Sequence, residues 1–204
     1  LMEMKKLSRN QISNNLKFSI REGEPYIILI QHPLSSEVKD AYRQMKITLE
    51  SIKSMGLTTI ISFPNSDAGG YEIIRAIEEY SSVPFIYTAK NISRLDFVNL
   101  LRNAACLVGN SSLGILEAPL LKLPVVNVGN RQTGRLHAEN VQFVPHEKNA
   151  IIAAIQMAVY DETYISTIKR CQNPYGNGKS SHKIAEILAN TIIDEKLLIK
   201  DITY

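Results

Sequence analysis

Six short apolar runs recur along the chain, and a longer stretch of mixed polar and apolar residues follows each of them. The runs lie at residues 26–31, 57–63, 83–87, 106–108, 125–128 and 141–144. Runs of this length without polar alternation are typical of strands that are buried on both faces of a sheet. The stretches between and after them predict helices at about 35–55, 70–80, 93–103, 149–160 and 180–193.

The alternation of strands and helices predicts the α/β fold class, with a Rossmann-like doubly wound parallel sheet of order 3-2-1-4-5-6. In such a sheet, ligands bind beyond the carboxyl ends of the strands where the order reverses, here between strands 1 and 4. Strand 1 is followed by His32, and strand 4 by Gly109, Asn110, Ser111 and Ser112. We therefore expect His32 and the serine pair to lie close together.

Local signals refine the ends of the helices. Ser35 or Ser36 is expected to cap the first helix, and Gly56 to end it. Ser93 and Asp96 resemble a capping box that opens the helix at 93–103. Residues 1–24 are predicted to be a connector or a short N-terminal helix, and residues 25–204 the α/β domain. The opening Leu-Met-Glu-Met is consistent with a piece cut from a longer protein.

Composition narrows the partners. The formal net charge of +3 arises from 23 basic and 20 acidic residues without a basic block, which disfavours nucleic acid and fits a small anionic ligand.

No apolar run is long enough to span a bilayer and no signal peptide is recognisable, so we expect no membrane partner and a cytoplasmic location. The two cysteines have no metal-binding spacing, and we expect Cys106 to be buried, with no metal or cofactor.

The stretch from Ala104 to Asn140 carries the clearest chemical signal. A strand ends at Gly109, and the serine pair then opens a predicted helix whose first N–H groups lack internal partners and favour an anion. Glu117 is expected about a turn and a half into this helix, where a carboxylate could accept two ribose hydroxyls. Arg131 and Arg135 follow the next strand, and their guanidinium groups could each donate two hydrogen bonds to phosphate oxygens. We interpret the stretch as a nucleotide diphosphate site. Because the glycine patterns of dinucleotide-binding and P-loop proteins are absent, NAD and P-loop nucleotides are disfavoured.

Each of these residues also has a structural alternative. The serines could simply cap a helix, Glu117 could face solvent, and both arginines could pair with Glu139. Asn65 and Asp67 follow strand 2 and could contribute to the same site, or they could be turn residues only. His32 suits proton transfer or phosphate binding. Three other histidines are predicted to be surface residues: His137, His146 and His182.

Five motifs, in order over about residues 25–193, together resemble the UDP-N-acetylglucosamine 2-epimerase family. They are Gln31-His32-Pro33, Phe63-Pro64-Asn65-x-Asp67-Ala68-Gly69, Gly109-Asn110-Ser111-Ser112 with Glu117, Gly129-x-Arg131-Gln132-x-Gly134-Arg135, and Asn173-Pro174-Tyr175-Gly176-x-Gly178. The resemblance implies the C-terminal half of a two-domain enzyme of the GT-B type, which binds UDP-N-acetylglucosamine in the cleft between its halves. The missing N-terminal domain, and further copies in a homo-oligomer (dimer or tetramer), are implied partners.

The resemblance also implies roles for individual residues. It implies a catalytic role for His32, and UDP binding by Asn65, Ile92, Ser111, Ser112, Glu117 and Arg131. From its position after the fifth strand, Arg135 is also expected to bind UDP. Asn177 stands where the family usually has aspartate. The implied reaction eliminates UDP to give a 2-acetamidoglucal, and the groups that move the C2 proton belong to the missing domain. We therefore expect the isolated domain to be inactive.

The resemblance favours the hydrolysing branch, which forms N-acetylmannosamine and UDP for sialic acid or cell-surface polysaccharide synthesis. The nonhydrolysing branch usually shows Asp-Ser-Gly-Gly and Thr-Glu-Arg-Pro-Glu motifs, where this chain has Asn-Ser-Ser-Leu and Arg-Gln-Thr-Gly-Arg. The alternatives are a nonhydrolysing UDP-sugar 2-epimerase, the nucleotide-binding domain of a GT-B glycosyltransferase, and a non-catalytic module that only binds UDP or a partner.

Overall fold

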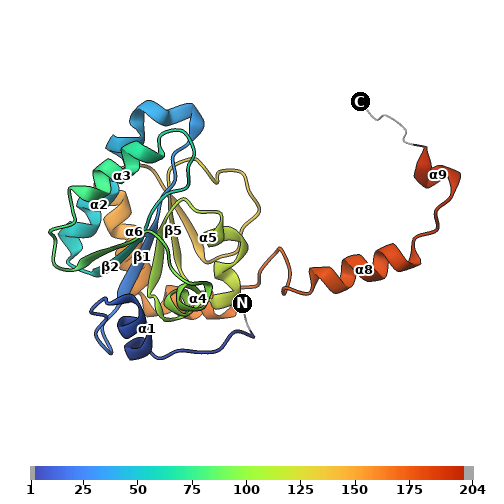
Figure 1. Cartoon of the computed structure of the whole chain (residues 1–204), viewed down its shortest axis with the longest axis horizontal. Helices are drawn as coiled ribbons and strands as arrows, with labels where there is room; N and C mark the ends of the chain where they lie inside the picture. Colours follow the sequence, from blue (N-terminus) through green and yellow to red (C-terminus); the bar gives the residue numbers. More distant parts are fainter. Residues whose placement is uncertain (1–2, 200–204) are drawn as a thin grey trace. The chain divides into compact units, whose positions relative to one another are not determined.

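A computed structural model describes residues 3–199 and contains a parallel sheet with six strands in the order β3-β2-β1-β4-β5-β6 (Figure 1). The strands are β1 Tyr26–Ile30, β2 Thr58–Ser62, β3 Ile86–Ala89, β4 Cys106–Gly109, β5 Val125–Val128 and β6 Val141–Val144. All five neighbouring pairs are parallel. The predicted fold class and strand order are confirmed.

Helices connect these strands. The α-helices before residue 175 are α1 Arg9–Leu16, α2 Ala41–Met55, α3 Gly70–Glu78, α4 Arg94–Asn103, α5 Leu113–Leu116, α6 Lys148–Tyr160 and α7 Glu162–Arg170. Two 3-10 helices, η1 Ser35–Asp40 and η2 Ala118–Leu121, adjoin α2 and α5. Residues 175–199 form a second unit that contains α8 Ser180–Asn190 and α9 Glu195–Leu198.

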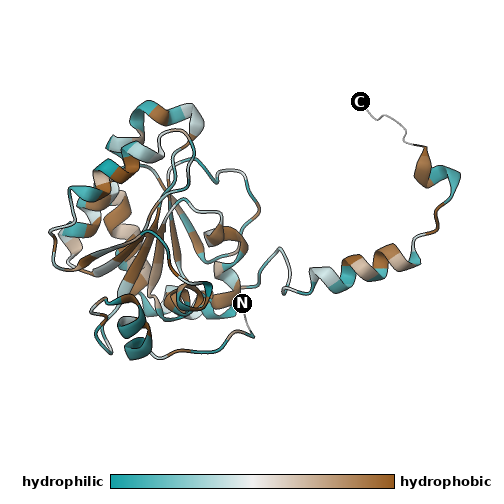
Figure 2. Ribbon diagram, viewed as in Figure 1, coloured by the Kyte–Doolittle hydropathy of each residue, from teal (hydrophilic) through white to brown (hydrophobic). Residues whose placement is uncertain are grey.

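The sheet carries one apolar core on each face, and the strands are the most continuously apolar part of the ribbon (Figure 2). On one face, β-strand side chains such as Ile27 and Leu29 pack against α2, α3 and α6. On the other face, Ile28 and Ile30 pack against α1, α4, α5 and η2. All five side chains of β1 are buried, as the unbroken apolar run predicts for a central strand.

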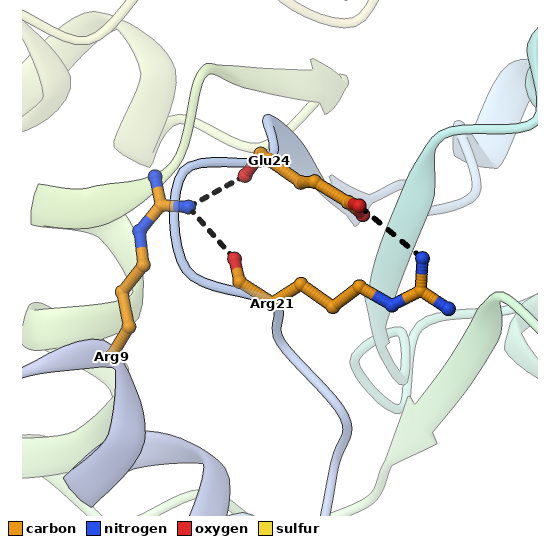
Figure 3. Close-up of polar contacts among 3 residues, drawn as sticks. All are labelled: Arg9, Arg21 and Glu24. Carbon is orange, nitrogen blue, oxygen red and sulfur yellow. Dashed lines mark hydrogen bonds and ion pairs between the residues drawn. The ribbon is translucent and has the colours of Figure 1, made fainter.

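The N-terminal residues pack onto this second face. Helix α1 buries Ile12 in the core, and Ser8 caps it with a complete capping box. Arg9 Nη1 donates to the carbonyl oxygens of Arg21 and Glu24, whose side chains form an ion pair with each other at 3.2 Å (Figure 3). Arg9 Nη2 donates to Asn103 O at 3.1 Å. Of the two alternatives expected for residues 1–24, the structure contains the short helix, α1, while the expected domain boundary at residue 25 stays a prediction.

Two local predictions are wrong. Neither Ser35 nor Ser36 caps a helix, because Leu34 precedes η1 without a side-chain cap and Glu37 adopts non-helical angles before α2 begins. The third strand begins at Ile86 rather than at Val83. Residues 80–86 instead form turns in which Val83 N–H donates to Tyr80 O and Ile86 N–H to Val83 O.

The chain after β6 contains more helix than predicted. Helix α7 is not among the predicted helices, although Asp161 caps it and its own Ile168 is buried. Helix α8 ends at Asn190, three residues before the predicted end, and α9 was not expected either. No helix within residues 3–199 is long and apolar enough to cross a membrane.

Candidate functional site

The ends of β1 and β4 lie side by side at the point where the strand order reverses. Ile30 is in register with Gly109, so the residues that follow them meet. His32 N–H donates to Asn110 Oδ1 at 2.7 Å, and Asn110 Nδ2 donates to His32 O at 2.9 Å. The predicted proximity of His32 to the turn that carries Ser111 and Ser112 is therefore observed.

Gly109 is required by this close approach. It has a φ of +118°, and a Cβ atom there would lie 2.1 Å from Ile30 O. The glycine at this position therefore allows a close approach between two strands. Gly114 is similarly constrained, since its Cβ would lie 2.8 Å from Val125 Cγ1.

The imidazole of His32 is half-buried and in contact with the residues that follow β2. Asn65 N–H donates to His32 Nδ1 at 3.1 Å, and Asn65 Nδ2 donates to Asp67 Oδ2 at 2.6 Å. Because Nδ1 accepts, the neutral ring carries its proton on Nε2. Burial and, second, the Arg131 cation lower the pKa of His32 below its usual 6.5, although Asp67 and the Asn65 side chain act in the opposite direction.

The loop after β5 reaches the same point. Arg131 Nη1 donates to Asn110 O at 3.2 Å, and Gln132 Nε2 donates to the same oxygen at 2.9 Å. Gln132 is 1% exposed, and its Oε1 is buried without a partner among the described residues. Arg135 is exposed. Within residues 3–199 no ion pair joins Arg131 or Arg135 to Glu139, which removes the expected structural alternative for the two arginines.

The serine pair opens a shorter helix than expected. Helix α5 is only four residues long, so its dipole contributes little. Leu113 N–H donates to Ser111 Oγ at 3.4 Å, but the Ser112 side chain makes no capping bond. Simple capping therefore does not account for the Ser112 hydroxyl.

The expectation that Glu117 lies inside this helix is wrong. Glu117 is half-buried at the junction of α5 and η2 with a φ of −117°, because Pro119 restrains the preceding residues and the chain continues as a 3-10 helix. Ile92 is half-buried between β3 and α4 and packs on the core beneath α4. In the described part of the chain, no hydrogen bond joins Glu117 or Ile92 to His32.

His146 was expected at the surface and is instead half-buried. A Cβ atom on Gly129 would lie 2.2 Å from His146 Nε2, so the ring lies directly over the start of the arginine-bearing loop. Burial is the main cause of a lowered pKa at His146. The residues around His146 in the sequence carry no signal of this contact, which depends on how β5 and β6 pair.

Asn110 and Gln132 are the residues that sequence reasoning missed. Both belong to the motifs quoted above, and Asn110 directly follows a buried strand, a position where a polar side chain can serve the carboxyl edge of the sheet. Among residues 3–199 no cluster of histidine, cysteine, aspartate or glutamate could hold a metal ion.

The chain is similar to known proteins in both sequence and fold. A family model described as UDP-N-acetylglucosamine 2-epimerase matches residues 1–189. The UDP-N,N'-diacetylbacillosamine 2-epimerase (hydrolyzing) of Legionella pneumophila is 31% identical over 91% of this chain and 48% of its own length. The UDP-N-acetylglucosamine 2-epimerase of Neisseria meningitidis is 33% identical over 66% of this chain and 36% of its own length. The chain thus spans at most about half the length of these relatives.

Solved structures show the same fold. The crystal structure of the Neisseria meningitidis UDP-GlcNAc 2-epimerase bound to UDP-GlcNAc matches 90% of this chain and 49% of its own, with a TM-score of 0.72 and 22% identity. The S. aureus MnaA–UDP structure matches 91% of this chain and 48% of its own, with a TM-score of 0.67 and 16% identity.

Proposed function

The chain belongs to the UDP-N-acetylglucosamine 2-epimerase family, and from this membership we propose that it is the nucleotide-binding C-terminal half of such an enzyme. The observation that carries the proposal is the meeting of His32, Asn65, Asn110 and Arg131 beyond the carboxyl ends of the adjacent strands. Such a place is where open α/β sheets bind ligands.

In this proposal UDP lies across the ends of β1, β4 and β5. Ser111, Ser112, Arg131 and Arg135 donate to the diphosphate, since hydroxyls and guanidinium groups are strong donors to phosphate oxygens. Asn65 also contacts UDP. Glu117 accepts from the ribose hydroxyls, and the Ile92 loop faces the uracil. The half-buried Glu117 follows the serines across the four residues of α5, which supports this order along the nucleotide.

His32 is the proposed catalytic residue of this half. Its lowered pKa favours the neutral ring, and the Asn65 N–H holds the proton on Nε2. A neutral Nε2–H can donate to the oxygen between sugar and diphosphate as negative charge develops there.

We propose the hydrolysing reaction. A base in the other half removes the C2 proton, the bond from C1 to the UDP oxygen breaks, and 2-acetamidoglucal and UDP form. Water then adds to the glucal and gives N-acetylmannosamine. Two relatives that carry "hydrolyzing" in their names, from Legionella pneumophila and Campylobacter jejuni, support this branch at 31% and 29% identity. They also make a diacetylated bacillosamine-type sugar a candidate substrate.

The second half of the cleft is proposed to be an N-terminal domain outside these 204 residues. Within the second unit, Ile184, Ile187 and Leu188 form an apolar face of helix α8 at helical spacing. A short helix of this kind needs a surface to pack on. Because the chain spans about half of its relatives, we assign that surface to the missing domain. We also propose that the whole enzyme is cytoplasmic and forms a homo-oligomer.

The test supplies UDP-N-acetylglucosamine to the two-domain enzyme in deuterated water and follows the products by NMR. We expect UDP, N-acetylmannosamine and deuterium at C2. A glycosyltransferase would instead transfer the sugar to an acceptor and leave the C2 proton unexchanged, and an epimerised UDP-sugar would indicate the nonhydrolysing branch. Absence of all these products, with UDP bound, would indicate a binding module and contradict the proposal.

A further inference from the structure

We propose that Asn110 is a positioning residue, which sets His32 and Arg131 in one fixed arrangement for the nucleotide-sugar. This inference rests on the proposed function, because that function gives the two residues their roles. Asn110 is 4% exposed and therefore acts through its neighbours within the fold.

The side chain of Asn110 supplies hydrogen bonds to the main chain just beyond the end of β1, where the sheet no longer provides them. That strand ends at Ile30, so the main-chain groups of His32 lie beyond the ladder, and Pro33 offers no N–H for a further bond. Asn110 N–H still donates to Ile30 O at 3.0 Å. Its side chain then bonds both main-chain groups of His32, the N–H through Oδ1 and the carbonyl through Nδ2.

An asparagine is suited to this task because its amide is donor and acceptor at once. An aspartate would keep the acceptor but place a charge against His32 O, and an alanine would leave both main-chain groups of His32 without these partners. The two bonds fix the backbone from which the His32 ring projects toward Asn65.

The main chain of Asn110 fixes the other side of the site. Its carbonyl oxygen accepts from both Arg131 and Gln132, so one residue after β4 links the residue after β1 to the loop after β5. Because Gln132 is buried, its side chain has little freedom to move and stays bonded to this oxygen. The distance between His32 and the Arg131 cation is thus set through a single residue.

The experiment compares Asn110→Ala with Asn99→Ala in the full chain. Asn99 is a matched control because it is also buried and its amide also binds main chain: Oδ1 accepts from Leu7 N–H, and Nδ2 donates to Lys5 O and Leu95 O. Three quantities are measured: the thermal midpoint, the affinity for UDP by calorimetry, and the pKa of the His32 ring by NMR titration.

We expect both variants to lower the thermal midpoint, but only Asn110→Ala to weaken UDP binding, by roughly tenfold, about 1.4 kcal/mol. The pKa of His32 should rise toward 6.5 in Asn110→Ala alone, because the freed backbone lets the ring leave its buried place beside Arg131, Asp67 and Asn65. Equal affinities and equal His32 pKa values in the two variants would overturn the proposal.

A measurement on the unaltered chain decides the question even if Asn110→Ala does not fold. The His32 amide proton should exchange with deuterated water as slowly as that of Ile28 inside β1. Exchange as fast as that of exposed Ser66 would overturn the positioning role. The amide and pKa readouts do not require UDP, so failure of UDP binding alone would count against the proposed function and leave this inference to stand on its own result.

Discussion

Replacement of Gly109 by alanine should separate the two strands that build the site. A Cβ at this position would lie 2.1 Å from Ile30 O, whereas an ordinary contact between carbon and carbonyl oxygen is about 3.3 Å. Backbone must therefore move by roughly 1 Å, since no flexible side chain lies between them. The same oxygen accepts the Asn110 N–H, so the movement also strains that bond.

The expected loss of stability combines two costs. Holding alanine at a φ of +118° costs about 1–3 kcal/mol. Weakening the ladder beside Asn110 adds about 1 kcal/mol, and the steric conflict adds more. We expect a total loss of roughly 4 kcal/mol or more in the free energy of unfolding, a large part of the about 5–15 kcal/mol typical of a domain.

Gly134→Ala is the matched control for this substitution. Gly134 also has a positive φ, +81°, but nothing lies within 4 Å of the place that a Cβ atom would occupy. It should lose about 1–2 kcal/mol from backbone strain alone. Urea denaturation measures both variants. If the two substitutions cost the same, the close contact between β1 and β4 does not constrain Gly109 and the reasoning fails.

Three further predictions follow from the site and the core. Ser112→Ala and Glu117→Ala should each weaken UDP binding severalfold by calorimetry, and unchanged affinity in both would remove the proposed contacts to phosphate and ribose. Burial lowers the folded-state pKa of His32 and His146 below 6.5, so the unfolded state takes up protons first as the pH falls. The free energy of unfolding should therefore decrease from pH 7 to pH 5, and it should decrease less in His32→Gln. Urea titrations at each pH measure this difference. Burial raises the pKa of the Cys106 thiol to about 12, so iodoacetamide at pH 8 should modify Cys106 only when the chain opens, and rapid labelling of the native chain by mass spectrometry would contradict its place in the core.

The sheet was predictable because its signal is carried by short apolar runs. Tyr26–Ile30 and Val125–Val128 are buried at every position, so their hydrophobicity is nearly continuous in the sequence. The right-handed β-α-β rule then leaves few possible orders, and the switch point between β1 and β4 follows from the order.

The local errors arise where a proline or a tertiary contact decides the backbone. Pro119 ends α5 one turn after the serines, although Leu116, Glu117 and Ala118 are good helix formers. Ile86 begins β3 after a turn that includes Pro84. Helix α7 buries Ile168, which gives it support that local propensity does not reveal.

The site itself was predictable only in part. His32, Ser111 and Ser112 follow strands, so their neighbourhood could be derived from topology. The roles of Asn110 and Gln132 could not, because both depend on hydrogen bonds between residues more than 20 positions apart. The position of His146 over Gly129 likewise depends on the pairing of β5 with β6.

The most direct test of the central claim is a titration of the chain with UDP, followed residue by residue through amide chemical shifts. Because the chain is proposed to supply only half of the cleft, we expect weak binding, with a Kd of about 0.1–1 mM. The account predicts the largest shifts at His32, Ser111, Ser112 and Arg131. Binding that leaves these amides unchanged, or no binding at several millimolar UDP, would contradict it.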